Sequence, residues 1–241
     1  MTKELDTFDW FTRRDTTHLR PLIKEYISNM HPAAATETRR DRQMRMLRQM
    51  DSLCLTCSMC DLGLVPATKN GISRDPHVFS NLNPSPFMIV GQNPGWDETE
   101  QKQPFVGAAG KKFDKEITKH GLSRNDFYIG NSVRCFTAGN ARPTAKHKER
   151  CEPFLQIELN ILRPKLVITL GAVAFSQFCP QAIYAECLKK ITKSEGYGVP
   201  VFAIYHPSPL NLSDSSREEA FDDQIKVLCQ LIKALRVGAS S

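Results

Sequence analysis

The sequence contains no apolar run approaching the ~20 residues that a membrane-spanning helix needs. Its first residues, Met1 to Asp6, are acidic and lack the apolar core of an export signal. It also has no internal repeat and no low-complexity tract. We therefore expect a protein of the cytoplasm or its equivalent, without a membrane partner. Its 241 residues, 41% hydrophobic and 24% charged, suit one α/β domain with an extension.

A strong excess of one charge is also absent, because the formal net charge is only +6. That balance is compatible with a phosphate-backbone partner but is common among other proteins too. The basic residues nevertheless gather in two segments: Arg39, Arg40, Arg42, Arg45 and Arg48, and then Arg142, Lys146, Lys148 and Arg150. Each segment is interpreted either as a solvated helix face or as a surface that contacts DNA phosphates.

Cysteine is plentiful, but eight cysteines without an export signal argue against a disulfide scaffold. Two residues separate Cys54 from Cys57 and Cys57 from Cys60, and Cys135 and Cys151 lie far downstream. These five indicate a framework for a metal ion or cluster, and thiolates suit zinc as well as iron–sulfur. The remaining three stand in apolar stretches and are expected to be core thiols: Cys179, Cys187 and Cys229.

The chain divides into two expected parts. Residues 1–50 are rich in helix formers and basic residues, and the segment 32–36 breaks them into two predicted helices. They form a helical extension to an α/β domain at residues 51–241. Within that domain, the stretch from Cys60 to Pro86 has Gly, Pro, Asn and Ser at intervals and is predicted to be a long loop.

After Pro86, short apolar runs alternate with helical periods. Strands are predicted at 87–90, 127–129, 165–170 and 201–205, and helices at 108–120, 146–162 and about 216–235. This alternation indicates right-handed βαβ units. We expect a three-layer α/β/α sandwich around a central four-stranded parallel sheet. Ligands bind beyond the carboxyl ends of such strands, where the segments 91–95, 131–135 and 206–210 fall.

Four short motifs follow these strands: Gly91-Gln-Asn-Pro-Gly95, Gln103-Pro-Phe-Val-Gly107, Tyr128-Ile-Gly-Asn-Ser-Val-Arg-Cys135 and Tyr205-His-Pro-Ser-Pro-Leu210. In this order, and with the cysteine spacing, they resemble the family 4, iron–sulfur uracil-DNA glycosylases. The resemblance runs from about Cys57 to the C-terminus and leaves out residues 1–50. It implies a base-excision repair hydrolase that everts uracil from single- or double-stranded DNA and leaves an abasic site. We expect it to act as a monomer.

The same resemblance implies a 4Fe–4S cluster. Its ligands would be Cys57, Cys60, Cys135 and Cys151, because the last two are sixteen positions apart, as in the family, and Cys60-Asp-Leu62 matches the family's C-x-L. Cys54 would be a spare or a substitute ligand. The expected role of the cluster is structural: it would hold the long loop and the basic segment 136–150 against DNA phosphates.

The resemblance also assigns roles around the everted base. Phe105 would stack on it, and the amide of Asn131 would accept from uracil N3–H and donate to O4, a pattern that cytosine reverses. His206 would stabilise charge on uracil O2. Leu210 would fill the gap left in the duplex, and Ser208 would contact a phosphate. Core packing for Phe105, a strand cap for Asn131 and a purely structural role for His206 are the competing interpretations.

The first motif departs from the family pattern, which reads G-E-A-P-G or G-E-G-P-G. Gln92 resembles the family 1 motif G-Q-D-P-Y and is expected in the base site. Asn93 resembles the mismatch-directed and single-strand-selective branches, whose motif is G-x-N-P-G. A neutral amide is not a strong base, but a sugar cation needs only an oriented water. Asn93 is therefore the predicted water-positioning residue.

Base specificity depends on two further positions. Gly95 stands where family 1 has a tyrosine that blocks the thymine methyl group, and Glu98 matches an acidic family residue that would close the gap. If Glu98 points elsewhere, 5-substituted uracils could enter. Gln103 in place of the usual arginine, and the lack of an arginine after Leu212, predict altered DNA-backbone contacts.

Two alternatives therefore stay open. One is a glycosylase for a modified or mismatched pyrimidine, such as hydroxymethyluracil or thymine opposite guanine. The other is a catalytically silent uracil-DNA-binding protein. No lysine is placed as a Schiff-base nucleophile, so strand cleavage is not expected. The C-x-x-x-C-x-x-C spacing of radical enzymes and the K-R-R-I-H insertion of uracil-trapping relatives are both absent.

Overall fold

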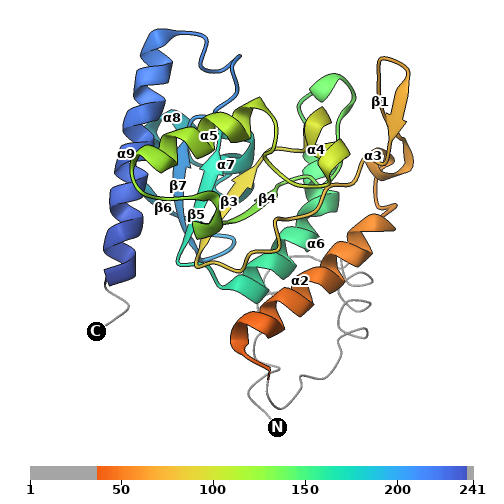
Figure 1. The fold of residues 1–241 in the computed structure, drawn as a ribbon, viewed down its shortest axis with the longest axis horizontal. Coiled ribbons are helices and arrows are strands. Elements are labelled where there is room, and N and C mark those ends of the chain that lie inside the picture. Colours follow the sequence, from red (N-terminus) through yellow and green to blue (C-terminus); the bar gives the residue numbers. More distant parts are fainter. Residues whose placement is uncertain (1–36, 238–241) are drawn as a thin grey trace.

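The computed structural model describes residues 37–237 (Figure 1). The predicted helices of residues 1–36, with the break at 32–36, lie outside the described residues. Within residues 37–237, no helix combines the length and the apolar character that crossing a membrane requires.

The centre of the fold is a five-stranded sheet of order β4-β3-β5-β7-β6. Its strands are β3 (Phe87–Gly91), β4 (Tyr128–Asn131), β5 (Leu166–Leu170), β6 (Ile191–Lys193) and β7 (Pro200–Ile204). The four predicted strands are present and parallel to one another. The sheet differs from the predicted four-stranded one in having a fifth strand, because β6 adds an antiparallel edge. This strand has three residues, none of them buried, so it lacks the apolar run that marks the other strands.

Helices cover both faces of the sheet, which confirms the α/β class. Phe87 and Ile89 of β3 face α5 (Ala108–Lys119) and α9 (Ser215–Val237), whereas Met88 and Val90 face the other core. That second core is completed by α2 (Arg39–Leu55), α6 (Ala145–Leu162) and α7 (Ala172–Phe178). Because successive strand residues point to opposite faces, an unbroken apolar run is what a sheet buried on both sides requires. The result is three layers.

The register brings the carboxyl ends of the parallel strands to one edge. Gly91 pairs with Asn131, and Leu170 pairs with Ile204. The first, third and fourth motifs therefore leave the sheet at the same edge, as expected from their positions after strands. The loop after β7 and the short helix α4 (Trp96–Gln101) lie at the same end of the molecule (Figure 1).

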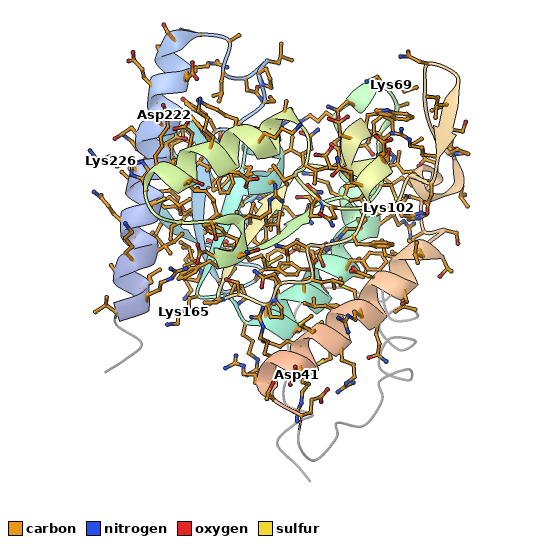
Figure 2. The ribbon with its side chains drawn as sticks, viewed as in Figure 1. Asp41, Lys69, Lys102, Lys165, Asp222 and Lys226 are labelled. Carbon is orange, nitrogen blue, oxygen red and sulfur yellow. The ribbon has the colours of Figure 1, made fainter. Side chains whose placement is uncertain are left out.

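Helix α2 packs against α6 at the opposite end of the molecule (Figure 1). The expected boundary between residues 50 and 51 falls inside this helix. Two of its arginines are held by neighbouring protein groups: Arg40 donates to Asn83 Oδ1 at 2.7 Å and to Pro84 O at 3.0 Å, and Arg45 pairs with Glu37 at 2.8 Å. Asp41, at the start of α2, lies far from Lys69 (Figure 2).

The segment from Cys60 to Pro86 is more regular than the predicted loop. It contains α3 (Asp61–Leu64) and a hairpin of β1 (Ala67–Lys69) and β2 (Ile72–Arg74). Asn70 and Gly71 form the turn with positive φ angles of 51° and 76°. An Asn-Gly pair between short strands is a strong hairpin signal, so the sequence does contain an indication of this hairpin. The remaining short elements are α8 (Tyr184–Cys187), η3 (Arg124–Asp126) and η4 (Ala138–Asn140).

Candidate active site and cysteine cluster

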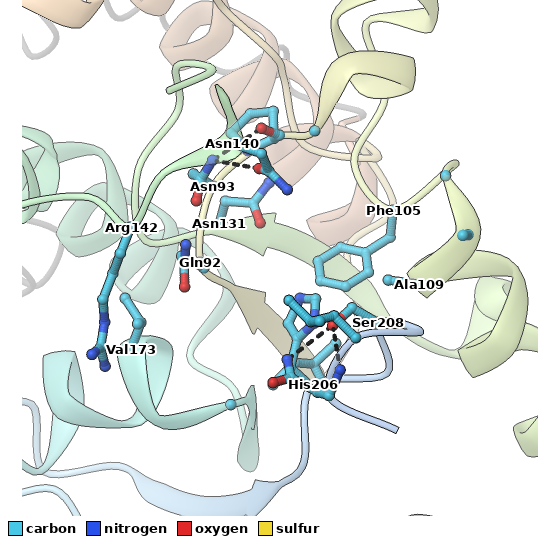
Figure 3. A pocket seen from close by; sticks show the side chains of 18 of the residues that line it. Gln92, Asn93, Phe105, Ala109, Asn131, Asn140, Arg142, Val173, His206 and Ser208 are labelled. Atoms are coloured by element: carbon cyan, nitrogen blue, oxygen red, sulfur yellow. Dashed lines mark hydrogen bonds between the residues drawn. The ribbon is translucent and has the colours of Figure 1, made fainter. Parts of the chain in front are cut away.

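A cavity of about 1080 Å³ opens at the carboxyl ends of the parallel strands. It brings together every residue that the sequence predicted for the base, the water and the DNA backbone: Gln92, Asn93, Glu98, Phe105, Asn131, His206, Ser208 and Leu210. Figure 3 shows Phe105, Asn131 and His206 around one space, each from a different segment of the chain. A sequence-remote set of polar and aromatic groups that meets in one concave site is the usual form of a binding site.

Phe105 is held in the cavity by an unusual backbone. Its φ angle is +54°, a region that non-glycine residues seldom occupy and that is often found at functional sites. Arg124 stabilises this turn by donating to the carbonyl oxygens of Pro104 and Phe105. A Cβ at Gly110 would lie 1.8 Å from the Phe105 carbonyl oxygen, so only glycine permits this approach.

The Phe105 ring and the Asn131 amide converge on Gly91. A Cβ at Gly91 would lie 2.4 Å from Phe105 Cε2 and 2.5 Å from Asn131 Oδ1. Asn131 is only 3% exposed, and its Oδ1 has no hydrogen-bond donor among the described residues. Buried acceptors in folded proteins are nearly always paired. An unpaired acceptor at a cavity wall is therefore a candidate to accept a hydrogen bond from a ligand.

His206 faces Phe105 from the loop after β7. Their ring centroids are 6.1 Å apart and the planes are tilted by 43°. Desolvation lowers the pKa of His206 from 6.5 to about 4, so the imidazole is neutral at physiological pH. Gly171, with a φ of +86°, allows His206 to lie close to the backbone after β5, since a Cβ on Gly171 would lie 3.0 Å from His206 Cβ.

The side chain of Asn93 has a defined orientation. Its Nδ2 donates to Pro94 O at 3.0 Å and to Thr137 Oγ1 at 3.1 Å, with Asn140 Oδ1 at 3.4 Å. Thr137 gives its own hydroxyl proton to Ala141 O at 2.5 Å, so its oxygen can only accept from Asn93. This leaves Asn93 Oδ1 as an acceptor without a donor among residues 37–237.

Glu98 occupies the space beside Gly95. Its Oε1 accepts from the backbone N–H of Val106 at 3.0 Å and of Gly107 at 2.9 Å. Its Oε2 would lie 2.6 Å from a Cβ at Gly95. The carboxylate is therefore tied to the Phe105 loop and points at the position where a larger side chain would otherwise stand.

The other predicted residues lie at the rim or in the wall. Leu210 is 86% exposed, and the Ser208 hydroxyl accepts from Asn211 Nδ2 at 2.9 Å in the same loop. The side chain of Gln92 lines the cavity, while its carbonyl accepts from Val133 N–H at 3.0 Å.

All five cysteines of the predicted framework line a second, smaller cavity: Cys54, Cys57, Cys60, Cys135 and Cys151. The backbone N–H of Arg134 donates to Cys151 Sγ at 3.2 Å. Within residues 37–237, no three His, Cys, Asp or Glu side chains are grouped closely enough to ligate a single metal ion. Of the predicted core thiols, Cys179 and Cys229 are buried and Cys187 is half-buried, so the prediction is wrong for Cys187.

Several residues of both sites carried no signal in the sequence. Thr137 contacts Asn93, which is 44 positions away in the sequence. Arg124 contacts Pro104 and Phe105, which are 20 and 19 positions away. Beside the cysteine cavity, buried Arg134 forms an ion pair with Glu158, which also accepts from the Tyr128 hydroxyl. Charged residues are seldom fully buried, so no sequence pattern indicates such a pair.

Comparison with known proteins agrees with this geometry. Residues 78–229 match the family described as the uracil DNA glycosylase superfamily. The chain is 33% identical to the type-4 uracil-DNA glycosylase of Archaeoglobus fulgidus over 180 residues, which covers 72% of this chain and 87% of that protein. It is also 33% identical to the type-4 enzyme of Thermotoga maritima over 145 residues, 57% of this chain and 73% of that protein.

The chain therefore belongs to the uracil-DNA glycosylase superfamily, with the type-4 uracil-DNA glycosylases among its relatives. The resemblance seen in the sequence motifs is confirmed. A type-5 uracil-DNA glycosylase from Pyrobaculum aerophilum is 34% identical, but over 101 residues, 39% of this chain and 44% of that protein. The similarity to the type-4 proteins thus extends over more of the chain.

Proposed function

We propose that this protein hydrolyses the N-glycosidic bond of a uracil everted from DNA, releases free uracil and leaves an abasic site for base-excision repair. The observation that carries the proposal is the convergence of the Phe105 ring, the unpaired Asn131 Oδ1 and the neutral His206 imidazole on one cavity. DNA containing uracil is the partner, and a monomer suffices because all these residues come from one chain.

Recognition would begin with eversion, which costs a few kcal/mol. Stacking on Phe105 would return about 1–3 kcal/mol. Asn131 Oδ1 would accept from uracil N3–H, and its Nδ2 would donate to O4. Cytosine has an acceptor at N3 and a donor at N4, so it would leave the buried amide unpaired on both sides.

Bond cleavage develops negative charge on uracil O2 and positive charge on the sugar. A neutral imidazole N–H near O2 would stabilise the leaving anion by hydrogen bonding without first transferring a proton. Burial of the site strengthens this interaction because water does not compete for the anion. His206 is accordingly the proposed electrostatic residue.

The attacking water would be held by Asn93. Because Thr137 and Asn140 accept from Nδ2, the Oδ1 atom is the one available to accept from a water. An oxocarbenium-like sugar is a strong electrophile, so orientation of the water matters more than deprotonation. This geometry favours a hydrolase over a catalytically silent DNA-binding protein.

The position of Glu98 bears on base specificity. Two backbone N–H groups hold one carboxylate oxygen, and the other oxygen fills the gap at Gly95. A 5-methyl or 5-hydroxymethyl group would have to displace this anchored carboxylate. Uracil is therefore favoured over thymine and hydroxymethyluracil, the alternatives that the sequence left open.

We further propose that Cys57, Cys60, Cys135 and Cys151 hold a 4Fe–4S cluster, with Cys54 as a spare thiol in the same lining. The donor set fits, because these four thiols line one cavity. Four cysteine thiolates are the usual ligands of a 4Fe–4S cluster. The cluster would tie the segment after α2 to the loop after β4 and to helix α6, without taking part in hydrolysis.

The test is base release from an oligonucleotide panel by the purified, coloured protein. The panel contains uracil, hydroxymethyluracil, thymine opposite guanine, and hypoxanthine, each in single- and double-stranded DNA. We expect release of uracil above all other bases, with no strand cleavage before alkali or heat. Tight binding of uracil DNA with no release would support the silent binder instead.

A further inference from the structure

The cavity extends beyond the proposed base site to the β1–β2 hairpin. Thr68 and Lys69 of β1 line it together with Trp96, Phe136 and Gly139. The strand β1 also packs against α4 and η4. These residues are separate from the Phe105, Asn131 and His206 group. A volume of about 1080 Å³ is at the upper end of the range for small-molecule sites, so it exceeds what one pyrimidine needs.

The hairpin is fixed to the helix that carries Glu98. The Arg74 guanidinium carbon lies 4.2 Å from the centroid of the Trp96 ring, and its Nη2 is 3.0 Å from Glu100 Oε1. Trp96 in turn meets Phe136 edge-on, with centroids 5.9 Å apart. Because Arg74, Trp96 and Phe136 come from three segments, the hairpin keeps a defined position relative to the base site.

The charge around the cavity favours a polyanion. Lys69 is exposed, with its Nζ 5.9 Å from the Trp96 centroid, and it makes no ion pair with any described residue. Arg142, after η4, and Arg217, near the start of α9, also line the cavity and are exposed. Of the two carboxylates in the lining, Glu98 is engaged by backbone N–H groups and Asp97 is exposed.

We propose that the β1–β2 hairpin is a DNA-contacting arm in which Lys69 holds a backbone phosphate near the everted nucleotide. This rests on the proposed function, since it assumes that DNA crosses the cavity mouth. The Asn70-Gly71 turn and the Arg74–Trp96 contact hold the arm in place, so Lys69 meets the strand without an ordering step in the protein. The arm contributes to binding and takes no part in bond cleavage.

The experiment measures DNA binding against salt for the intact, coloured protein. The ligand is an oligonucleotide with one 2′-fluoro-deoxyuridine, which resists hydrolysis. Lys69→Ala should reduce the slope of log Kd against log salt by about 0.7–0.9, the value for one phosphate. Over one decade of salt this is roughly a sixfold difference in Kd. Lys69→Arg should keep the slope.

The matched control is Lys226→Ala. It removes the same charge from an exposed residue of α9, which lies on the far side of the molecule from Lys69 (Figure 2). It should leave the slope unchanged. A second readout replaces single phosphates near the uracil with neutral methylphosphonates. At one position, the methylphosphonate should weaken DNA binding by the wild type. The same replacement should not weaken DNA binding by Lys69→Ala any further.

Two results would overturn the proposal: a Lys69→Ala slope and methylphosphonate profile equal to those of the wild type, or equal losses in Lys69→Ala and Lys226→Ala. The outcome is separable from failure of the proposed function. If the wild type released no uracil, these binding measurements on uncleaved DNA would still report whether Lys69 meets a phosphate.

Discussion

The Asn93 amide donates to the Thr137 hydroxyl over 3.1 Å, and Thr137 donates onward to the Ala141 carbonyl. The order of donors and acceptors in this series of hydrogen bonds decides which end of the Asn93 amide faces the cavity. A hydroxyl that has given away its proton can only accept, so Nδ2 points to Thr137 and Oδ1 points away. Thr137 is thus a positioning residue for the proposed water site.

This relationship gives the first prediction. Thr137→Val, which removes the hydroxyl at similar volume, should lower kcat by roughly 10-fold, as expected for loss of about 1.4 kcal/mol, while KM changes little. Thr137→Ser should retain most of the rate. In an Asn93→Ala background, Thr137→Val should have no further effect, because the amide that it orients is gone. A full additional loss in that background would show that Thr137 has only a structural role.

The second prediction concerns Glu98 and base choice. Glu98→Ala should raise the rate on hydroxymethyluracil and on thymine relative to uracil, because it empties the space beside Gly95. Glu98→Gln should keep the preference for uracil, since its amide oxygen can still accept from Val106 and Gly107. Single-turnover rates on the three substrates give the ratios. An unchanged ratio in Glu98→Ala would remove Glu98 as the specificity residue.

The third prediction follows from the pKa of His206, which burial lowers from 6.5 to about 4. Well above pH 6.5 the imidazole is neutral in both the folded and the unfolded chain, so it has no effect on stability there. As the pH falls from 6.5 towards 4, the unfolded chain binds a proton that the folded chain does not. The free energy of unfolding should therefore decrease on acidification.

Denaturant unfolding at pH 7 and pH 5 measures this decrease. The wild type should lose about 2 kcal/mol more than His206→Asn over that interval. The variant keeps a polar side chain at the position but no group that titrates there. Equal losses in the two proteins would mean that the imidazole is not desolvated in the folded state.

The fourth prediction separates the cysteines. Cys135→Ser should lose visible absorption and most of its bound iron, and should aggregate, because the Cys135 thiol joins the loop after β4 to the proposed cluster. Cys54→Ser should keep the iron content of the wild type, since Cys54 is a spare thiol in this account. Iron analysis and the visible spectrum of both proteins provide the measurement. Full iron in Cys135→Ser would remove Cys135 from the ligand set.

Much of the site could be predicted because its residues follow strands that are plain in the sequence. Gly91, Asn131 and His206 each end or follow an apolar run, and parallel strands bring their carboxyl ends together. The sequence does not predict the edge strand β6, because its three residues, two of them exposed, give no apolar run. The β1–β2 hairpin lies where the sequence predicts a loop, although Asn70-Gly71 is a recognisable turn.

The supporting residues were beyond sequence analysis for a different reason. Thr137, Arg124 and Trp96 have no local pattern that distinguishes them, and their partners lie elsewhere in the chain. Their roles exist only once tertiary contacts are formed. The positive φ of Phe105 is likewise not predictable from the sequence, since Gly110 alone does not indicate that the Phe105 carbonyl lies against it.

The central claim is that one cavity holds an everted uracil between Phe105, Asn131 and His206 and cleaves its glycosidic bond. Single-turnover release of free uracil from DNA by the wild type, Asn131→Ala and His206→Ala tests it most directly. We predict release by the wild type and a loss of at least about 100-fold in each variant, with unchanged circular dichroism and iron content. Near-wild-type rates in either folded variant, or no release by the wild type, would contradict the account.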